Sequence, residues 1–287
     1  MIKYKNVKIK DLDIFYREAG SRENPTILLL HGFPTSSHMF RNLMMKLESS
    51  YHLIAPDYPG FGQSSMPLVN EFDYSFDNLA TVIAEFIDVI ELKDYSLYLM
   101  DYGAPVGFRI ATKYPNRLQS LIIQNGNAYE EGLKEFWEPL KAYWKNPENE
   151  NTIDNVRKLL TIDATRWQYT HGVQDVEKIS PDNWIHDQAL LDRKGNKEIQ
   201  LQLFLSYSTN LAFYPAWQEY FRQHQPPTLI AWGENDYIFP AEGAYPYKRD
   251  LNNLEFHLLN AGHFPLEDNN DKISALIDDF LTRKVKN

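Results

Sequence analysis

An acidic residue stands at the end of a strand-like run in LYLMDYGAPVG, residues 97–107. The apolar run ends at Asp101, small residues follow at once, and the next residues have helical spacing. A sharp turn from strand to helix exposes the side chain at its tip, and enzymes place a nucleophile there, usually serine in G-x-S-x-G. Asp101 could equally cap the helix that follows, which is a common role for aspartate. This stretch alone leaves both interpretations open.

Two later loops carry the groups that a nucleophilic carboxylate needs. Asp236 follows the strand-like residues 227–232 in the sequence GEND, and His263 follows the strand-like residues 254–259 in NAGHF. The chain order of nucleophile, acid and histidine is the order found in hydrolases built on a strand–turn–helix nucleophile. In such a triad the acid orients the imidazole, and the imidazole takes a proton from water. The three sites together favour a catalytic role for Asp101.

The elements that must position these residues alternate between short apolar strands and amphipathic helices. Such alternation predicts an α/β fold with a mostly parallel central sheet that is flanked by helices on both faces. Strands are predicted at 2–8, 12–18, 26–33, 52–62, 95–100, 118–125, 226–236 and 254–259, and helices at 37–47, 73–90, 103–113, 241–250 and 270–284.

Residues 127–224 have a different pattern, because helical spacing dominates and aromatic residues are frequent. We expect residues 1–126 and 225–287 to form the core domain and residues 127–224 to form an inserted helical cap. A cleft between a cap and a sheet is a common place for a pocket. Five tryptophans fall in this segment: Trp137, Trp144, Trp167, Trp184 and Trp217.

Composition narrows the classes of function. The 287 residues include no cysteine, which excludes thiol chemistry and Cys-ligated zinc. The formal net charge of −10 argues against binding to nucleic acid, and no apolar run approaches the roughly 20 residues of a membrane helix. His171 and His186 are too far apart and too poorly accompanied to form a metal site. We therefore expect a soluble cytoplasmic monomer or homodimer that needs no cofactor or metal and whose partners are a small-molecule substrate and water.

The chain resembles the α/β-hydrolase superfamily at HGFPTSS (31–37), APDYPGFGQS (55–64), MDYGAP (100–105), WGEND (232–236) and AGHFPLED (261–268). Within it, the chain is similar to the aspartate-nucleophile branch, which includes epoxide hydrolases and haloalkane dehalogenases. The resemblance implies an α/β-hydrolase fold with an inserted cap and a covalent alkyl ester on the nucleophile. It also implies that the backbone N–H groups of Phe33 and Tyr102 form an oxyanion hole.

The resemblance favours epoxides as substrates. An epoxide opens to an alkoxide, and two tyrosines of the cap usually protonate or polarise its oxygen. The stretch LSYSTNL (205–211) resembles the segment that carries one of them, which gives Tyr207 this role. Tyr169 is the first candidate for the second tyrosine and Tyr214 is another. The aromatic composition of the cap predicts compact apolar substrates.

Two alternatives stay open. Haloalkane dehalogenation would use the same triad, but Tyr102 occupies the place of the usual halide-binding tryptophan and Phe33 that of a frequent asparagine. Tyr102 could offer its hydroxyl to a halide, with Trp167 or another tryptophan of the cap as the partner. The chain could also be a ligand-binding protein of this fold with little turnover, although Asp101, Asp236 and His263 argue against this.

Overall fold

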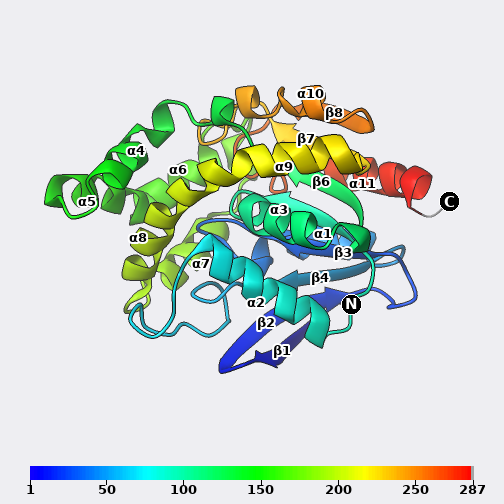
Figure 1. Ribbon diagram of the computed structural model, residues 1–287, viewed down its shortest axis with the longest axis horizontal. Coiled ribbons are helices and arrows are strands. Elements are labelled where there is room, and N and C mark those ends of the chain that lie inside the picture. The colour runs from blue at the N-terminus through cyan, green and yellow to red at the C-terminus, as the bar shows by residue number, and fades with distance from the viewer. Residues whose placement is uncertain (286–287) are drawn as a thin grey trace.

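An eight-stranded sheet forms the centre of the protein, and the computed structural model describes residues 1–285. The strands are β1 (Lys3–Ile9), β2 (Leu12–Ala19), β3 (Thr26–Leu30), β4 (His52–Pro56), β5 (Tyr95–Met100), β6 (Leu118–Gln124), β7 (Thr228–Gly233) and β8 (Leu254–Leu259). Their spatial order is β1-β2-β4-β3-β5-β6-β7-β8 (Figure 1). The hairpin β1–β2 and the pair β2–β4 are antiparallel, and all other neighbours are parallel. The predicted mostly parallel α/β sheet is confirmed.

Helices cover both faces of this sheet because its strands bury side chains on both faces. Alternate residues of β5 belong to two different apolar clusters: Leu97 and Leu99 pack on one side, Tyr98 and Met100 on the other. The first cluster includes residues of α2 (Phe76–Val89) and α3 (Gly103–Lys113), which contact each other. The second includes residues of α1 (Arg41–Leu47) and α11 (Asn270–Lys284), which also contact each other.

Some predicted helices are shorter in the structure for local reasons. Helix α2 begins only after Ser75, whose hydroxyl accepts a hydrogen bond from the backbone N–H of Asn78 and so caps the helix. The region 241–250 holds a 3₁₀ turn and the short α10 (Tyr247–Asp250). Pro246 directly precedes α10, and a proline has no N–H to continue a preceding helix.

Residues 127–224, called the helical segment below, lie between β6 and β7 and consist of helices, turns and loops. Figure 1 shows α4, α5, α6 and α8 gathered beyond one end of the sheet, whereas α9 runs back across the molecule; α9 contacts α3 and α10. The helices are α4 (Glu138–Lys145), α5 (Glu150–Arg157), α6 (Ile162–Thr170), α7 (Pro181–Leu191), α8 (Asn196–Ser206) and α9 (Asn210–His224).

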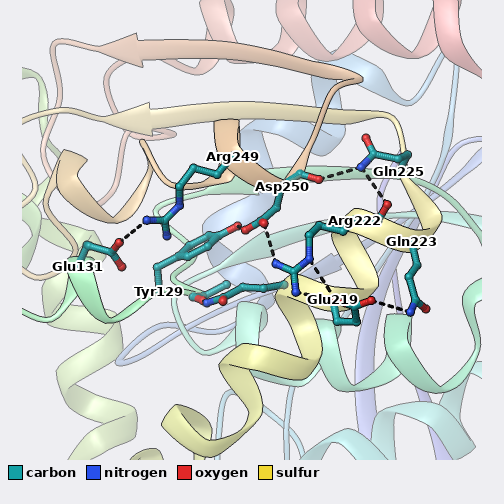
Figure 2. A network of polar contacts seen from close by, with 10 residues as sticks. Tyr129, Glu131, Glu219, Arg222, Gln223, Gln225, Arg249 and Asp250 are labelled. Atoms are coloured by element: carbon teal, nitrogen blue, oxygen red, sulfur yellow. Dashed lines mark hydrogen bonds and ion pairs between the residues drawn. The ribbon is translucent and has the colours of Figure 1, made fainter.

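A polar network on Asp250 joins the two places where the chain passes between the sheet and the helical segment. Tyr129, just after β6, donates its hydroxyl to Asp250 Oδ2 at 2.7 Å, and Arg222 of α9 donates to Asp250 Oδ1 at 2.8 Å. Gln225 donates to the backbone carbonyl of Asp250 at 2.8 Å. Figure 2 shows these side chains meeting at α10. The network therefore fixes both connections of the helical segment to one short helix of the core.

Candidate active site

Asp101 occupies a tight turn between β5 and α3. Its φ of +50° lies in the left-handed region, which is costly for a residue with a side chain. The turn is close-packed, because a Cβ on Gly103 would lie 2.1 Å from the carbonyl oxygen of Leu30 and one on Gly32 would lie 2.3 Å from Asp101 Oδ1. Asp101 does not cap α3: the N-cap position is Tyr102, and no side chain bonds there. The turn thus leaves the carboxylate available for another role.

The three residues predicted to form a triad lie together and are buried. His263 Nδ1 is 2.8 Å from Asp236 Oδ2, and His263 Nε2 is 3.9 Å from Asp101 Oδ2. Among the residues described, none forms a hydrogen bond with Nε2. This nitrogen can therefore accept a proton from a water molecule next to Asp101.

Two backbone N–H groups point at the carboxylate of Asp101. The N–H of Phe33 donates to Asp101 Oδ1 at 2.6 Å, and the N–H of Tyr102 also bonds to the carboxylate. Donors that are fixed by the backbone need no reorganisation when charge develops on the oxygen they face. Phe33 and Tyr102, the residues predicted to form an oxyanion hole, thus both contact the carboxylate of Asp101 through their backbone N–H groups.

Burial governs the titration of this group of residues. Burial raises the pKa of Asp101 to about 6, although nearby His263 and the N–H groups of Phe33 and Tyr102 oppose the shift. Burial alone would lower the pKa of His263, but the adjacent Asp236 carboxylate outweighs it and raises that pKa. Both side chains must be deprotonated to act as nucleophile and base, so activity through them is lost as pH falls.

Asn125 is a further residue of the site, and no motif in the sequence assigns it a role. It follows β6, has a φ of +46°, and is fully buried. Its Nδ2 donates to Asp236 Oδ2 at 2.7 Å, and its Oδ1 accepts from the N–H of Gly233 at 2.9 Å. The N–H of Ile238 donates to Asp236 Oδ1 at 2.8 Å. Because β6 and β7 are neighbours in the sheet, Asn125 at the end of β6 lies next to Asp236 after β7. A prediction of Asn125 would therefore have needed the order of the strands in the sheet.

A small cavity of about 30 Å³ opens in front of Asp101. This space is enough for a water molecule, so a substrate must be compact and must displace side chains of the helical segment. The lining residues come from both parts of the protein: Phe33, Asp101, Tyr102, Phe136, Trp137, Leu140, Leu159, Gln168, Phe204, Tyr207 and Ile238.

Tyr207 lines this cavity, and Tyr214, which does not line it, contacts Tyr207. The hydroxyl groups of Tyr207 and Tyr214 are hydrogen-bonded to each other, and Asn127 Nδ2 donates to the Tyr214 hydroxyl at 3.0 Å. The ring of Trp137 packs on Tyr207 with 4.4 Å between centroids. Burial raises the pKa of Tyr207 well above its usual value, so the phenol is protonated at neutral pH. Tyr207 is therefore a protonated phenol in the cavity wall whose hydroxyl is paired with that of Tyr214.

Three of the four residues expected to contact the substrate, Tyr169, Tyr214 and Trp167, do not line this cavity. Tyr169 donates its hydroxyl to Asp187 Oδ2 and stacks on Phe264 at 4.2 Å. Trp167 is half-buried and stacks on Phe136 and His171. Successive side chains of an α-helix point in directions about 100° apart. In α6 the residue between Trp167 and Tyr169 is Gln168, and this residue lines the cavity.

Comparison with known proteins identifies the family. A family model described as the alpha/beta hydrolase fold matches residues 25–270. The chain belongs to this family. It is 42% identical to an uncharacterized hydrolase of Saccharomyces cerevisiae, covering 99% of this chain and 98% of the relative. Haloalkane dehalogenase 2 of Mycobacterium tuberculosis is 27% identical over 92% of this chain and 90% of its own. The solved structure of the epoxide hydrolase CorEH superimposes with a TM-score of 0.79 at 17% identity, covering 99% of both chains, which shows the shared fold.

Two structural features bear on metal binding and membrane insertion. Within residues 1–285, no group of three His, Cys, Asp or Glu side chains is arranged to hold a metal ion. Over the same residues, no helix is both long and apolar enough to cross a membrane.

Proposed function

We propose that this hydrolase opens small epoxides to diols through a covalent ester on Asp101. The proposal rests on the buried carboxylate of Asp101, which two backbone N–H groups hold in front of His263 and which shares a cavity with Tyr207. A serine at this position would attack carbonyl carbons, whereas a carboxylate is suited to displacement at saturated carbon. We also propose that residues 127–224 act as a cap over the core formed by residues 1–126 and 225–287.

In the first step, a carboxylate oxygen of Asp101 attacks an epoxide carbon and forms a C–O ester bond. The ring C–O bond breaks, and its electron pair goes to the epoxide oxygen. Tyr207 transfers its phenolic proton to that oxygen, which leaves a hydroxyl group on the bound substrate and a phenolate on Tyr207. The support of Tyr207 by Tyr214 keeps the donor in place during this step.

In the second step, His263 Nε2 takes a proton from water, and the hydroxide attacks the ester carbonyl carbon of Asp101. The N–H groups of Phe33 and Tyr102 stabilise the resulting oxyanion. The C–O bond to the carbonyl carbon breaks, the departing diol oxygen takes the proton from His263, and the proton of the regenerated acid returns to Tyr207. Asp236 stabilises the charged imidazole throughout. The sum is epoxide plus water giving a diol.

Haloalkane dehalogenation is the second candidate. The similarity to a mycobacterial haloalkane dehalogenase over most of both chains favours it, as does the position of Tyr102 next to the nucleophile in the cavity wall. A halide leaves with the bonding electron pair and needs no proton, only hydrogen-bond donors. The two candidates therefore differ in the first step and share the second.

The test traps the ester. The His263→Gln variant retains the nucleophile but lacks the base, so it accumulates any adduct. It is incubated separately with 1,2-epoxybutane and 1-bromobutane, followed by intact mass measurement and peptide mapping. We expect an adduct on Asp101 from the epoxide. The matched control is the double variant Asp101→Asn, His263→Gln, which should give none.

Each other result has a definite meaning. An adduct from the bromoalkane alone replaces epoxide hydrolysis with dehalogenation. Adducts from both show one nucleophile with a broad range of leaving groups. The absence of an adduct from either compound contradicts the covalent mechanism and supports a ligand-binding protein with little turnover.

A further inference from the structure

Gln168 is a polar side chain in an otherwise mostly apolar part of the cavity wall. It belongs to α6, is only 4% exposed, and lines the cavity with Asp101. Its neighbours in the wall include Phe136, Leu140 and Leu159, whose side chains offer no hydrogen-bonding groups. Within residues 1–285, no residue forms a hydrogen bond with its amide, and the amide atoms are not among the fully enclosed polar atoms, so they border open space.

Gln188, a buried glutamine of the neighbouring helix α7, shows what a structural amide does in this protein. Its Oε1 accepts from Thr165 at 2.7 Å, and its Nε2 donates to the carbonyl of Leu160 and to Asp192. Gln188 thereby links α7 to α6 and to the turn that precedes α6. Gln168 ties nothing together, although it is as deeply buried. Gln168 instead lines the cavity that a substrate would fill.

We propose that Gln168 determines substrate specificity by hydrogen-bonding a polar group of the substrate, so that the preferred epoxides carry an ether, hydroxyl or carbonyl group near the ring. This inference rests on the function proposed above and goes beyond it, because the aromatic composition alone predicted apolar substrates. An amide both donates and accepts, which matches all three groups.

The physical reason is desolvation. When a compact substrate fills the cavity, it displaces the water that can solvate the amide. A purely aliphatic substrate leaves the amide buried without a partner, which is unfavourable, whereas an ether or hydroxyl oxygen restores a hydrogen bond. Sites built around a buried polar group reject the analogue that lacks the matching group more strongly than apolar pockets reject a missing methylene.

The experiment compares two epoxides of equal size. Glycidyl methyl ether and 1,2-epoxypentane differ only in one oxygen that replaces a methylene. The ratio of their kcat/KM values is measured for the wild type and for Gln168→Met, which keeps the length of the side chain but not its amide. Comparing the ratio between enzymes cancels the intrinsic reactivity of each epoxide. We expect the ratio of ether to alkane to fall about tenfold in the variant.

Two further variants keep the result interpretable. Gln168→Leu should reduce the ratio in the same direction, and it replaces Gln168→Met if that protein does not fold, as judged by thermal unfolding. Leu159→Met alters the same wall without changing its polarity, so its ratio should stay within about twofold of the wild type. An unchanged ratio in the Gln168 variants overturns the inference. An equal loss on both epoxides also overturns it, because the amide would then act on the reacting centre.

The outcome remains separable from that of the proposed function. If only bromoalkanes form the trapped adduct, the same ratio is measured as adduct formation from 1-bromo-2-methoxyethane and 1-bromobutane in the His263→Gln background, with and without Gln168→Met. A tenfold fall there supports the role of Gln168 although epoxide hydrolysis is wrong. If no compound of either class reacts with Asp101, both proposals fail.

Discussion

The two walls of the cavity are built in different ways. On the sheet side, Asp101, Asn125 and Asp236 follow the neighbouring strands β5, β6 and β7, and His263 follows β8. Backbone N–H groups or other members of the site hold each carboxylate. On the helical side, side-chain packing and hydroxyl pairs hold the groups that face the cavity. In the proposed mechanism, the strand ends hold the nucleophile and the base, whereas the helical segment supplies Tyr207 and Gln168.

This difference has a physical basis. Parallel strands end at one edge of the sheet, so residues that follow adjacent strands are brought together whatever the rest of the chain does. A residue on a helix reaches the cavity only if the rotation and packing of that helix turn it inward. Tyr207 is held by contacts with Trp137 and Tyr214, and those contacts depend on the arrangement of several helices.

The largest expected effect comes from the sheet wall. Asp101→Asn removes the nucleophile, and we expect turnover to fall by ~10⁴-fold or more. Asparagine tolerates the positive φ at this turn, and the buried carboxylate it replaces has a raised pKa. The thermal unfolding midpoint should therefore be equal or higher. Steady-state kinetics and a melting curve measure the two effects, and retained turnover in a folded variant contradicts the mechanism.

The helical wall should show an intermediate effect that depends on the substrate. Tyr207→Phe removes the proton donor, and we expect kcat/KM for 1,2-epoxybutane to fall on the order of 10²-fold. Formation of a bromoalkane adduct should fall far less, because a halide needs no proton. Tyr214→Phe is the matched control, since it removes only the supporting hydroxyl and should cost less. Equal losses on both substrate classes would show that Tyr207 shapes the wall and does not donate a proton.

The contrast between the walls also explains what the sequence could reveal. Alternating apolar strands and helices predicted the sheet, and the strand ends gave Asp101, Asp236 and His263. Tyr169 was the first choice for a second cavity tyrosine, yet its hydroxyl pairs with Asp187 and its neighbour Gln168 faces the cavity. The weak amphipathic pattern of α6 does not define its inward face. Such a choice depends on packing between helices, which local sequence does not encode.

Asn125 gives the last and smallest effect, a change in pH dependence. The sequence motifs did not point to Asn125, because an uncharged amide after a strand matches no part of a catalytic triad. In Asn125→Asp, a second carboxylate would replace the amide that lies 2.7 Å from Asp236 Oδ2. The added negative charge favours protonated His263, whose pKa Asp236 already raises.

His263 must be neutral to take a proton from water, so a further rise in its pKa moves the acidic limb of ester hydrolysis to higher pH. We expect the limb to shift by about one pH unit, so that the rate falls at pH values along the limb and recovers as the pH rises. Single-turnover hydrolysis of the preformed ester, followed across pH, measures this limb apart from alkylation. Asn125→Leu is the control: it also loses the hydrogen bond to Asp236 but adds no charge, so its rate should fall without the same upward shift. A limb that stays at its wild-type pH in Asn125→Asp would contradict this expectation, because it would show that the second carboxyl group is protonated and adds no charge.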